Sequence, residues 1–342
     1  MKLTRFAAVA GLALVPLGTT LQSTHKAGET RVTTFTITES TSMVDMQVLM
    51  NGEEGGMGEM EMTQEMTGMR AGVFTDSVRR GADGAPAIFT RNYSDLEKTA
   101  DMYMSNEMMG DEESSQEFES DLEGLTVLFT LDEGDYTASF PEGEAGDEDL
   151  LEGLEALLPW GGLLSSGEVS VDDEWEVEPR AFWSSLSLGA DLAWEDGEDV
   201  EGTLSVDPDT DEAEVDGEIT ATLTSVEDGL ATITLAVEIS EFIDMTEAVL
   251  AEAEGEDPGD VPEGAMMPDI KGLTTEESTE GEATVVWNIE GGYMVSFDAN
   301  LETASEQTLQ MAFEGGPQSM EIEQISSFEG ELEISVEVTV ER

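Results

Sequence analysis

The sequence predicts a mainly β protein of the α+β type, in which long antiparallel meander strands form two lobes with a few short helices. The first observation is strict alternation: between Leu332 and Val340, apolar residues occupy every second position and polar residues the others. A period of two is typical of a strand with one face on a core and the other in water. The second observation is turn chemistry, because Asp228-Gly229 separates two alternating runs, which is a strong hairpin signal.

The N-terminal β-rich lobe is expected over residues 30–198. Alternating apolar residues predict one long or broken strand over 35–50 and a partner strand over 60–66. A further hairpin is expected over 125–140, around a turn of acidic residues and glycine. An acidic, glycine-bearing stretch at 189–202 has the composition of a linker and marks the predicted lobe boundary.

Helices are expected at two places in this lobe. Leucines recur with helical spacing over 150–158, with Asp147 as a candidate N-cap and Pro159 as the stop. A second helix is expected to begin at Pro179, because proline is favoured at the first helical position.

The C-terminal antiparallel lobe is expected over residues 199–342. Hairpins are predicted over 219–239 and over 285–297, the second turning at Gly291-Gly292. The alternating run at 332–340 is expected to be the last strand of the meander.

The charge of the chain is extreme for a sequence with a globular pattern. Among 342 residues, 79 are Asp or Glu and 12 are Lys or Arg, which gives a formal net charge of −67. The 39% of apolar residues suffices for one large or two modest cores. Nucleic acid is excluded as a partner, because phosphate binding needs clustered basic side chains and only Arg79-Arg80 are adjacent. The acidic surface instead indicates a protein adapted to salt, with cations as its partners.

The near absence of two residue types excludes several chemistries. There is no cysteine, and His25 is the only histidine. Disulfides, thiol nucleophiles and Cys/His zinc sites are therefore excluded, and a Ser-His-Asp triad would have to use His25. His25 itself is expected in a tail or in a removed leader.

The N-terminus predicts export. Residues 1–22 carry Lys2 and Arg5, then an apolar run over 6–18 and a small polar stretch, which is the layout of a secretory signal peptide. This apolar run is shorter than the roughly 20 residues that span a bilayer, so no integral membrane protein is expected after cleavage. Cleavage is expected between Gly18 and Ala27, and residues 23–29 are expected to be a flexible N-terminus. The predicted location is periplasmic or extracellular.

Three segments carry a resemblance to uncharacterised exported β-rich bacterial proteins grouped as domains of unknown function. The first is the Met-rich acidic hairpin Met43–Met69, and the third is the strand pair Gly281–Leu301. The second is Leu157-Leu158-Pro159 leading into Gly167–Trp175, which resembles a V-x-V-G-D-x-W turn and strand, although Asp172 stands where that pattern has glycine. The resemblance implies an exported, two-lobed β fold and carries no catalytic residues.

The methionines of the predicted hairpin allow two interpretations. Met46, Met50, Met60, Met62 and Met66 either form its apolar face, or offer the soft thioether ligands that suit Cu(I). No histidine or cysteine lies near them, which favours the apolar face.

A candidate calcium site has the spacing of a known loop. Asp207, Asp209, Asp211 and Glu218 occupy positions 1, 3, 5 and 12 of the EF-hand template, which supplies the hard oxygens that Ca²⁺ requires. Glu212 stands where the template needs glycine, and the flanks are predicted strands. The sequence therefore predicts at most a looser Asp-lined turn site, with Ca²⁺ as the one candidate cofactor.

Other residue groups leave alternatives open. The acidic residues offer many carboxylate pairs for glycosidase-like chemistry, but nothing in the sequence nominates one pair. Trp160, Trp175, Trp183 and Trp194 indicate either buried core or an aromatic groove for a sugar or lipid. No nucleotide-binding glycine motif or nucleophile elbow occurs.

These observations favour an exported, non-catalytic envelope or extracellular protein with a binding or structural role. One alternative is a Ca²⁺-dependent cation-binding protein, and another is a carboxylate-dependent hydrolase. The sequence indicates neither a protein partner nor a particular small molecule.

Overall fold

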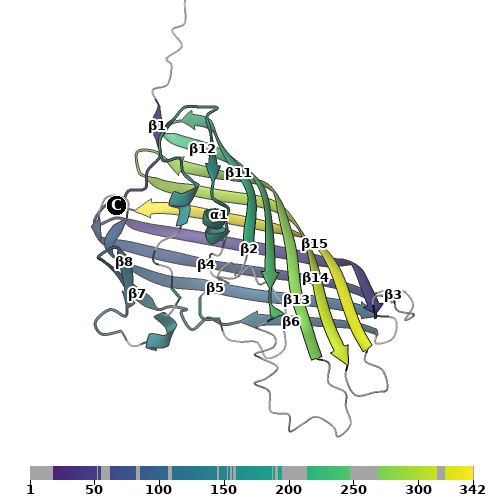
Figure 1. Ribbon diagram of the computed structural model, residues 1–342. Coiled ribbons are helices and arrows are strands. Elements are labelled where there is room, and N and C mark those ends of the chain that lie inside the picture. The colour runs from purple at the N-terminus through teal and green to yellow at the C-terminus, as the bar shows by residue number, and fades with distance from the viewer. Residues whose placement is uncertain are drawn as a thin grey trace, which may run out of the picture.

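The computed structural model confirms a mainly β, antiparallel fold. It describes residues 18–341 except 52, 55–61, 82–84, 107–109, 145, 152, 155, 157–158, 187, 189–191, 195–213, 247–268 and 314–319. The described residues form a 13-stranded sheet and a two-stranded sheet of β1 and β9. Figure 1 shows long strands side by side in a strongly curved sheet, with α1 against one face. None of the described helices is long and apolar enough to cross a membrane.

The large sheet has the order β10-β11-β12-β13-β14-β15-β2-β4-β5-β7-β8, with β3 beside β2 and β6 beside β5. Its strands are antiparallel to their neighbours. The strands are β1 (Thr19–Thr20), β2 (Thr30–Met50), β3 (Glu53–Glu54), β4 (Met62–Gly81), β5 (Pro86–Asn106), β6 (Gly110–Phe118), β7 (Thr126–Asp132), β8 (Asp135–Ser139), β9 (Glu168–Val169), β10 (Glu174–Val177), β11 (Glu214–Glu227), β12 (Leu230–Asp244), β13 (Asp269–Asn288), β14 (Tyr293–Phe313) and β15 (Met320–Glu341). The helices are η1 (Glu148–Leu151), η2 (Pro159–Leu163) and α1 (Pro179–Leu186).

The predicted hairpins are confirmed, and their turns explain them. Between β11 and β12, Asp228 and Gly229 have φ values of 51° and 82°. Two successive positive φ angles make a turn whose twist matches that of the flanking strands, and Asp-Gly adopts it readily. The expected strand over 35–50 is one 21-residue strand, β2, which has a register shift where it pairs with Ser327 and Phe328.

Both predicted lobes contribute to the same sheet. β15 pairs with β2 from Ile322–Met50 to Glu341–Thr30, which joins the end of the chain to its beginning. β10, from the predicted N-terminal lobe, pairs with β11. The predicted boundary at residues 198 and 199 lies outside the described residues, so the division into lobes stays a prediction.

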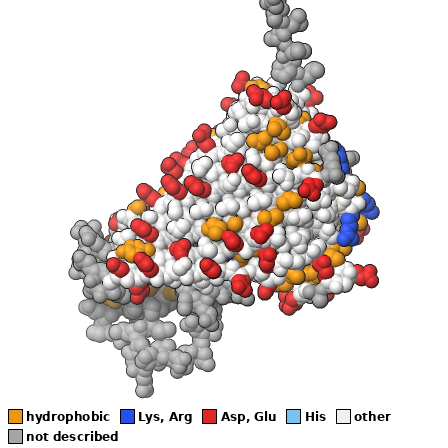
Figure 2. Space-filling model, turned by 180° about the vertical axis from the view of Figure 1, so that it is seen from behind, with side chains coloured by type: hydrophobic (Ala, Val, Ile, Leu, Met, Phe, Trp, Pro, Cys, Tyr) orange, Lys and Arg blue, Asp and Glu red, His pale blue; other side chains and the backbone are white. Residues whose placement is uncertain are grey.

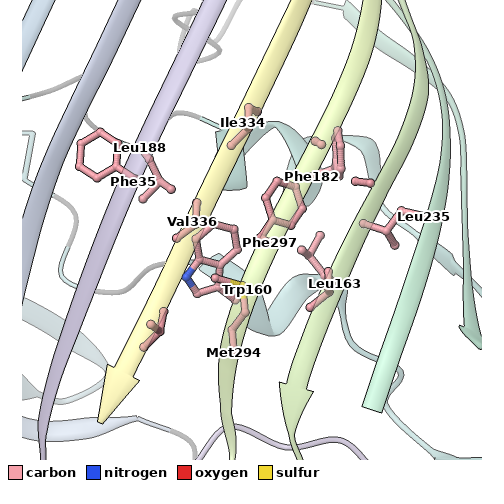
Figure 3. Close-up of a cluster of buried hydrophobic side chains, with 14 of the residues drawn as sticks. Phe35, Trp160, Leu163, Phe182, Leu188, Leu235, Met294, Phe297, Ile334 and Val336 are labelled. Atoms are coloured by element: carbon pink, nitrogen blue, oxygen red, sulfur yellow. The ribbon is translucent and has the colours of Figure 1, made fainter. Parts of the chain in front are cut away.

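We call the face of the large sheet that carries α1 the inner face, and the opposite face the outer face. Helical segments cover the middle of the inner face (Figure 3). The ring centroid of Phe297, on β14, lies 5.4 Å from that of Trp160 in η2 and 6.4 Å from that of Phe182 in α1. Leu163 and Val336 are buried in the same cluster. Burying each such side chain stabilises the fold by roughly 1.5 to 3 kcal/mol, so this cluster fixes the helical cover on the sheet.

The outer face carries much of the negative charge (Figure 2). On β15, the exposed Glu333 and Glu337 alternate with buried apolar residues, as the sequence predicts. One row crosses five strands: Glu218, Glu238, Glu280, Glu302 and Glu331 are direct partners in the register from β11 to β15. Neighbouring strands lie about 4.8 Å apart, so these like charges repel one another.

The predicted helix over 147–158 differs in the structure. Its described part is a 3₁₀ helix of four residues, η1, and Pro159 begins η2 instead of ending a helix. Asp147 does cap the segment, since its Oδ1 accepts a hydrogen bond from the N–H of Asp149 at 3.3 Å. Gly153 has a φ of 75°, a left-handed conformation that interrupts a right-handed helix. The helix predicted from Pro179 is confirmed as α1.

The segment 23–29 also differs from the flexible N-terminus that the sequence predicts. Thr24 donates hydrogen bonds from N to Gly292 O at 2.9 Å and from Oγ1 to Gly291 O at 2.8 Å. A Cβ on Gly292 would lie 2.3 Å from Thr24 Oγ1, so only glycine leaves room for this contact. His25 approaches Gly81 in the same way. The segment therefore packs against the hairpin ends of the sheet.

The residues just before this segment belong to the fold as well. Thr19 and Thr20 pair with Val169 and Glu168, and the Leu21 side chain is 3% exposed in the core. Residues 1–17 of the predicted signal peptide lie outside the described residues. Cleavage after Gly18, which is within the predicted range, would leave Thr19, Thr20 and Leu21 and their contacts in the mature protein.

Candidate functional site

A cavity of about 270 Å³ lies where the β4–β5 and β13–β14 turns meet the N-terminal segment and η2. Val78, Phe89, Met294 and Val338 supply apolar wall, and Gly161 of η2 closes one side. Its volume is just below the range of about 300 to 1,000 Å³ that is usual for drug-sized ligands, so it suits a smaller molecule. We call it the hairpin-end cavity.

One wall contains a buried ion pair between neighbouring strands. Arg91 of β5 and Asp76 of β4 are register partners. Arg91 Nε lies 2.7 Å from Asp76 Oδ1, and Nη2 lies 2.9 Å from Oδ2, which is a bidentate arrangement. Nη2 also donates to the carbonyl of Ala156, and the guanidinium lies 5.1 Å from the ring centroid of Phe74. Asp76 is therefore fully engaged in holding a buried cation.

A second buried arginine fixes the histidine. Arg31 Nε lies 2.6 Å from Glu29 Oε1, its Nη2 donates to the carbonyl of Thr24, and its Nη1 lies 3.1 Å from His25 Nε2. A guanidinium can only donate, so Nε2 is the acceptor and the proton of the neutral ring is on Nδ1. Burial, and then the charge of Arg31, lower the pKa of His25 to about 4. The ring is thus a neutral hydrogen-bond donor at neutral pH.

Three residues that line the hairpin-end cavity carry a ring N–H that is buried without a hydrogen-bond partner among the described residues. These N–H groups are Nδ1 of His25 and Nε1 of Trp160 and of Trp287. Trp160 and Trp287 are 7% and 2% exposed. An unpaired buried donor costs about 1 to 3 kcal/mol, so an acceptor atom brought within reach of any of the three would stabilise the protein.

The wall has little net charge. Arg31 and Arg91 are each matched by a carboxylate, from Glu29 and Asp76. The chain as a whole carries −67, and its field disfavours the approach of anions. The arrangement therefore suits an uncharged molecule with acceptor oxygens and an apolar body.

The structure does not test the calcium loop. Asp207, Asp209 and Asp211 lie outside the described residues. Glu218 lies on β11, exposed on the outer face and opposite Glu238. In the described part of the chain, no group of three or more His, Cys, Asp or Glu residues is placed to hold a metal ion. The calcium site stays a prediction.

The described methionines of the predicted hairpin lie on two long strands, β2 and β4. Met46 and Met50 alternate along β2, half-buried, and Met66 on β4 is a register partner of Met102 on β5. Met57 and Met60 lie outside the described residues. Among the tryptophans, Trp160 and Trp183 are buried core residues, as one of the two interpretations predicts.

Sequence reasoning missed the residues that define the hairpin-end cavity. Arg31 stands at a buried position of β2, two residues before the buried Thr33, and Arg91 stands at a buried position of β5, between the buried Phe89 and Tyr93. A basic residue at an inward position of an alternating strand is a detectable signal, because a buried charge needs a partner. No pattern in the sequence indicates that His25 is buried, because residues 23–29 have the composition of a flexible terminus.

Compared with known proteins, the sequence matches no family model and no curated relative.

Proposed function

We propose that this is an exported, non-catalytic binding protein that holds a small, uncharged ligand in the hairpin-end cavity. The ligand has an apolar body and at least one acceptor oxygen, such as a carbonyl. The observation that carries this proposal is the set of three unpaired ring N–H groups around one cavity. Binding in a preformed apolar pocket with a few polar groups is the usual design of such sites.

Two features support binding over catalysis. Both oxygens of Asp76 accept hydrogen bonds from Arg91, so this carboxylate is not free to take a proton from a substrate. The lowered pKa of His25 makes its ring a weak base. The charged and apolar pattern of residues 1–22 supports export. The acidic outer face supports adaptation of the protein to a salt-containing environment.

A pair of probes tests this proposal. Acetophenone and ethylbenzene share an aromatic body, but only acetophenone has an acceptor oxygen. We expect saturation-transfer NMR with the protein lacking residues 1–18 to give about five- to tenfold tighter binding of acetophenone, because one additional hydrogen bond contributes about 1 to 1.5 kcal/mol.

Matched tryptophan variants complete the experiment. Trp160→Phe keeps an aromatic ring and removes one N–H, so it should weaken acetophenone binding several-fold and leave ethylbenzene binding nearly unchanged. Trp183→Phe is the control, because Trp183 is also buried with an unpaired Nε1 but does not line the cavity. Equal binding of the two probes, or equal losses in the two variants, would contradict the proposal.

A further inference from the structure

A second polar zone lies on the inner face, beyond the apolar middle. Glu241 of β12 and Glu277 of β13 are direct register partners. Thr275 and Thr279 lie two residues to either side of Glu277 and therefore on the same face. Glu39 of β2 lies close enough to interact with Glu277. We call these five residues the carboxylate belt.

The charges that face the belt leave one carboxylate uncompensated. Arg70 of β4 favours the charged form of Glu39, and Arg180 of α1 favours that of Glu241. Around Glu277, in contrast, the interacting charges in the described chain are the carboxylates of Glu39 and Glu241. Three carboxylates and two guanidinium groups give the belt one excess negative charge.

A further cation lies on this side of the sheet, but the charges that shift the pKa of Glu277 are those of Glu39 and Glu241. Lys98 is the register partner of Arg70, and its Nζ lies 4.7 Å from the ring centroid of Phe118 on β6. Burial, and then the charges of Glu39 and Glu241, raise the pKa of Glu277 to about 7. Its charge is therefore costly unless a cation is near.

Acceptor atoms at the belt also lack partners. Glu241 Oε1, Thr275 Oγ1 and Thr279 Oγ1 are buried without a hydrogen bond to any described residue. Thr279 is 1% exposed, which makes its unpaired hydroxyl especially costly. These atoms and the Glu277 carboxylate offer acceptors from two adjacent strands, β12 and β13.

We propose that the carboxylate belt binds the primary ammonium group of an alkylamine. An ammonium brings one positive charge, which balances the belt, and three N–H donors for its unpaired acceptors. The belt borders the apolar core, since Ile239 on β12 and Leu332 on β15, the partner of Glu39, are both buried there, and this low-dielectric surrounding strengthens the attraction between a carboxylate and an ammonium. A single metal ion fits less well, because within the described ranges no three carboxylates are placed around one point.

Calorimetric titration of the protein lacking residues 1–18 with octylammonium chloride at pH 8 tests this site. Glu277→Gln should weaken binding at least tenfold, and Thr279→Val about threefold. Glu276→Gln is the matched control, because it removes the same charge from the next residue, which is exposed on the outer face. Binding to the unaltered protein should weaken as the pH falls from 8 to 6, since protonated Glu277 no longer attracts the ammonium.

Three results would overturn the proposal. Equal losses in Glu277→Gln and Glu276→Gln would mean general attraction to an acidic protein. Octanol binding as tightly as octylammonium would mean that only the alkyl chain is recognised. Displacement of octylammonium by CaCl₂, but not by NaCl at matched ionic strength, would mean that the belt is a metal site. Thermal melting of each variant separates loss of the site from loss of the fold.

Discussion

The guanidinium Nη1 of Arg31 lies 3.1 Å from the imidazole Nε2 of His25, and this contact orients the histidine. Arg31 belongs to β2 at the centre of the sheet, whereas His25 belongs to the segment that precedes it. The contact attaches that segment to the hairpin-end cavity and leaves Nδ1–H as a donor in the wall.

The first prediction concerns the protonation of His25. Because burial and Arg31 disfavour the imidazolium, its pKa should be about 4 by NMR titration, in a spectrum with only one histidine to assign. The unfolded chain binds this proton more readily, so this group lowers stability as the pH falls from about 6.5 to about 4. His25→Gln should remove that pH dependence. A measured pKa near 6.5 would contradict the burial of the ring.

A second prediction concerns the Arg91–Asp76 pair. Asp76→Asn leaves a buried guanidinium without its counter-charge, and we expect it to lower the free energy of unfolding by about 3 kcal/mol. Arg79→Met is the control. Arg79 lies three residues after Asp76 on β4 and is exposed, so its replacement should change the free energy of unfolding by less than about 0.5 kcal/mol. Urea denaturation measures both. Equal effects would show that Asp76 does not stabilise Arg91.

The glutamate row on the outer face leads to a third prediction. Glu280 has Glu238 and Glu302 as its direct partners, so Glu280→Gln should stabilise the protein by a few tenths of a kcal/mol at low salt. The gain should shrink as NaCl is raised, because salt screens the repulsion.

Glu337→Gln is the matched control for the row, because Glu337 is equally exposed but faces Ser296 and Thr34. Melting temperatures at low and high NaCl compare the two variants. An identical salt response in both would assign the effect to net charge and not to the row.

The fourth prediction uses the raised pKa of Glu277. The folded protein holds this proton up to about pH 7, while the unfolded chain releases it near pH 4.5. Stability from this group is therefore present at low pH and is lost as the pH rises from about 4.5 to 7. At pH 8, Glu277→Gln should stabilise the protein by about 2 kcal/mol, after allowance for partial screening. Glu276→Gln should lack this pH dependence, and a similar profile in both variants would contradict the burial of Glu277.

The strands were predictable because their physical determinants are local. Alternation over 332–340 depends only on which positions face the core, and Asp228-Gly229 supplies the two positive φ angles of its turn. The helix over 150–158 was predicted wrongly, because the spacing of its leucines was given more weight than the glycine within it. Leu150, Leu151 and Leu154 do pack against the core, partly buried, but Gly153 follows η1 with a left-handed conformation and η1 is limited to one turn.

The candidate site was less predictable because it forms between distant segments. His25, Trp160 and Trp287 come together through the packing of the N-terminal segment, η2 and the β13–β14 turn, and no local pattern encodes that packing. In a chain with 79 acidic residues, carboxylate spacing also matches many templates by chance, so it could not single out Glu277.

The central claim is that the unpaired ring N–H groups of residues lining the hairpin-end cavity donate hydrogen bonds to an acceptor oxygen of a bound ligand. The most direct measurement is a ¹H–¹⁵N spectrum of the tryptophan indoles during titration with acetophenone, because the chain has only five tryptophans. We predict that the Nε1–H signals of Trp160 and Trp287 shift downfield together and saturate, while that of Trp183 stays in place. Unchanged signals for Trp160 and Trp287, or an equal shift of Trp183, would contradict the account.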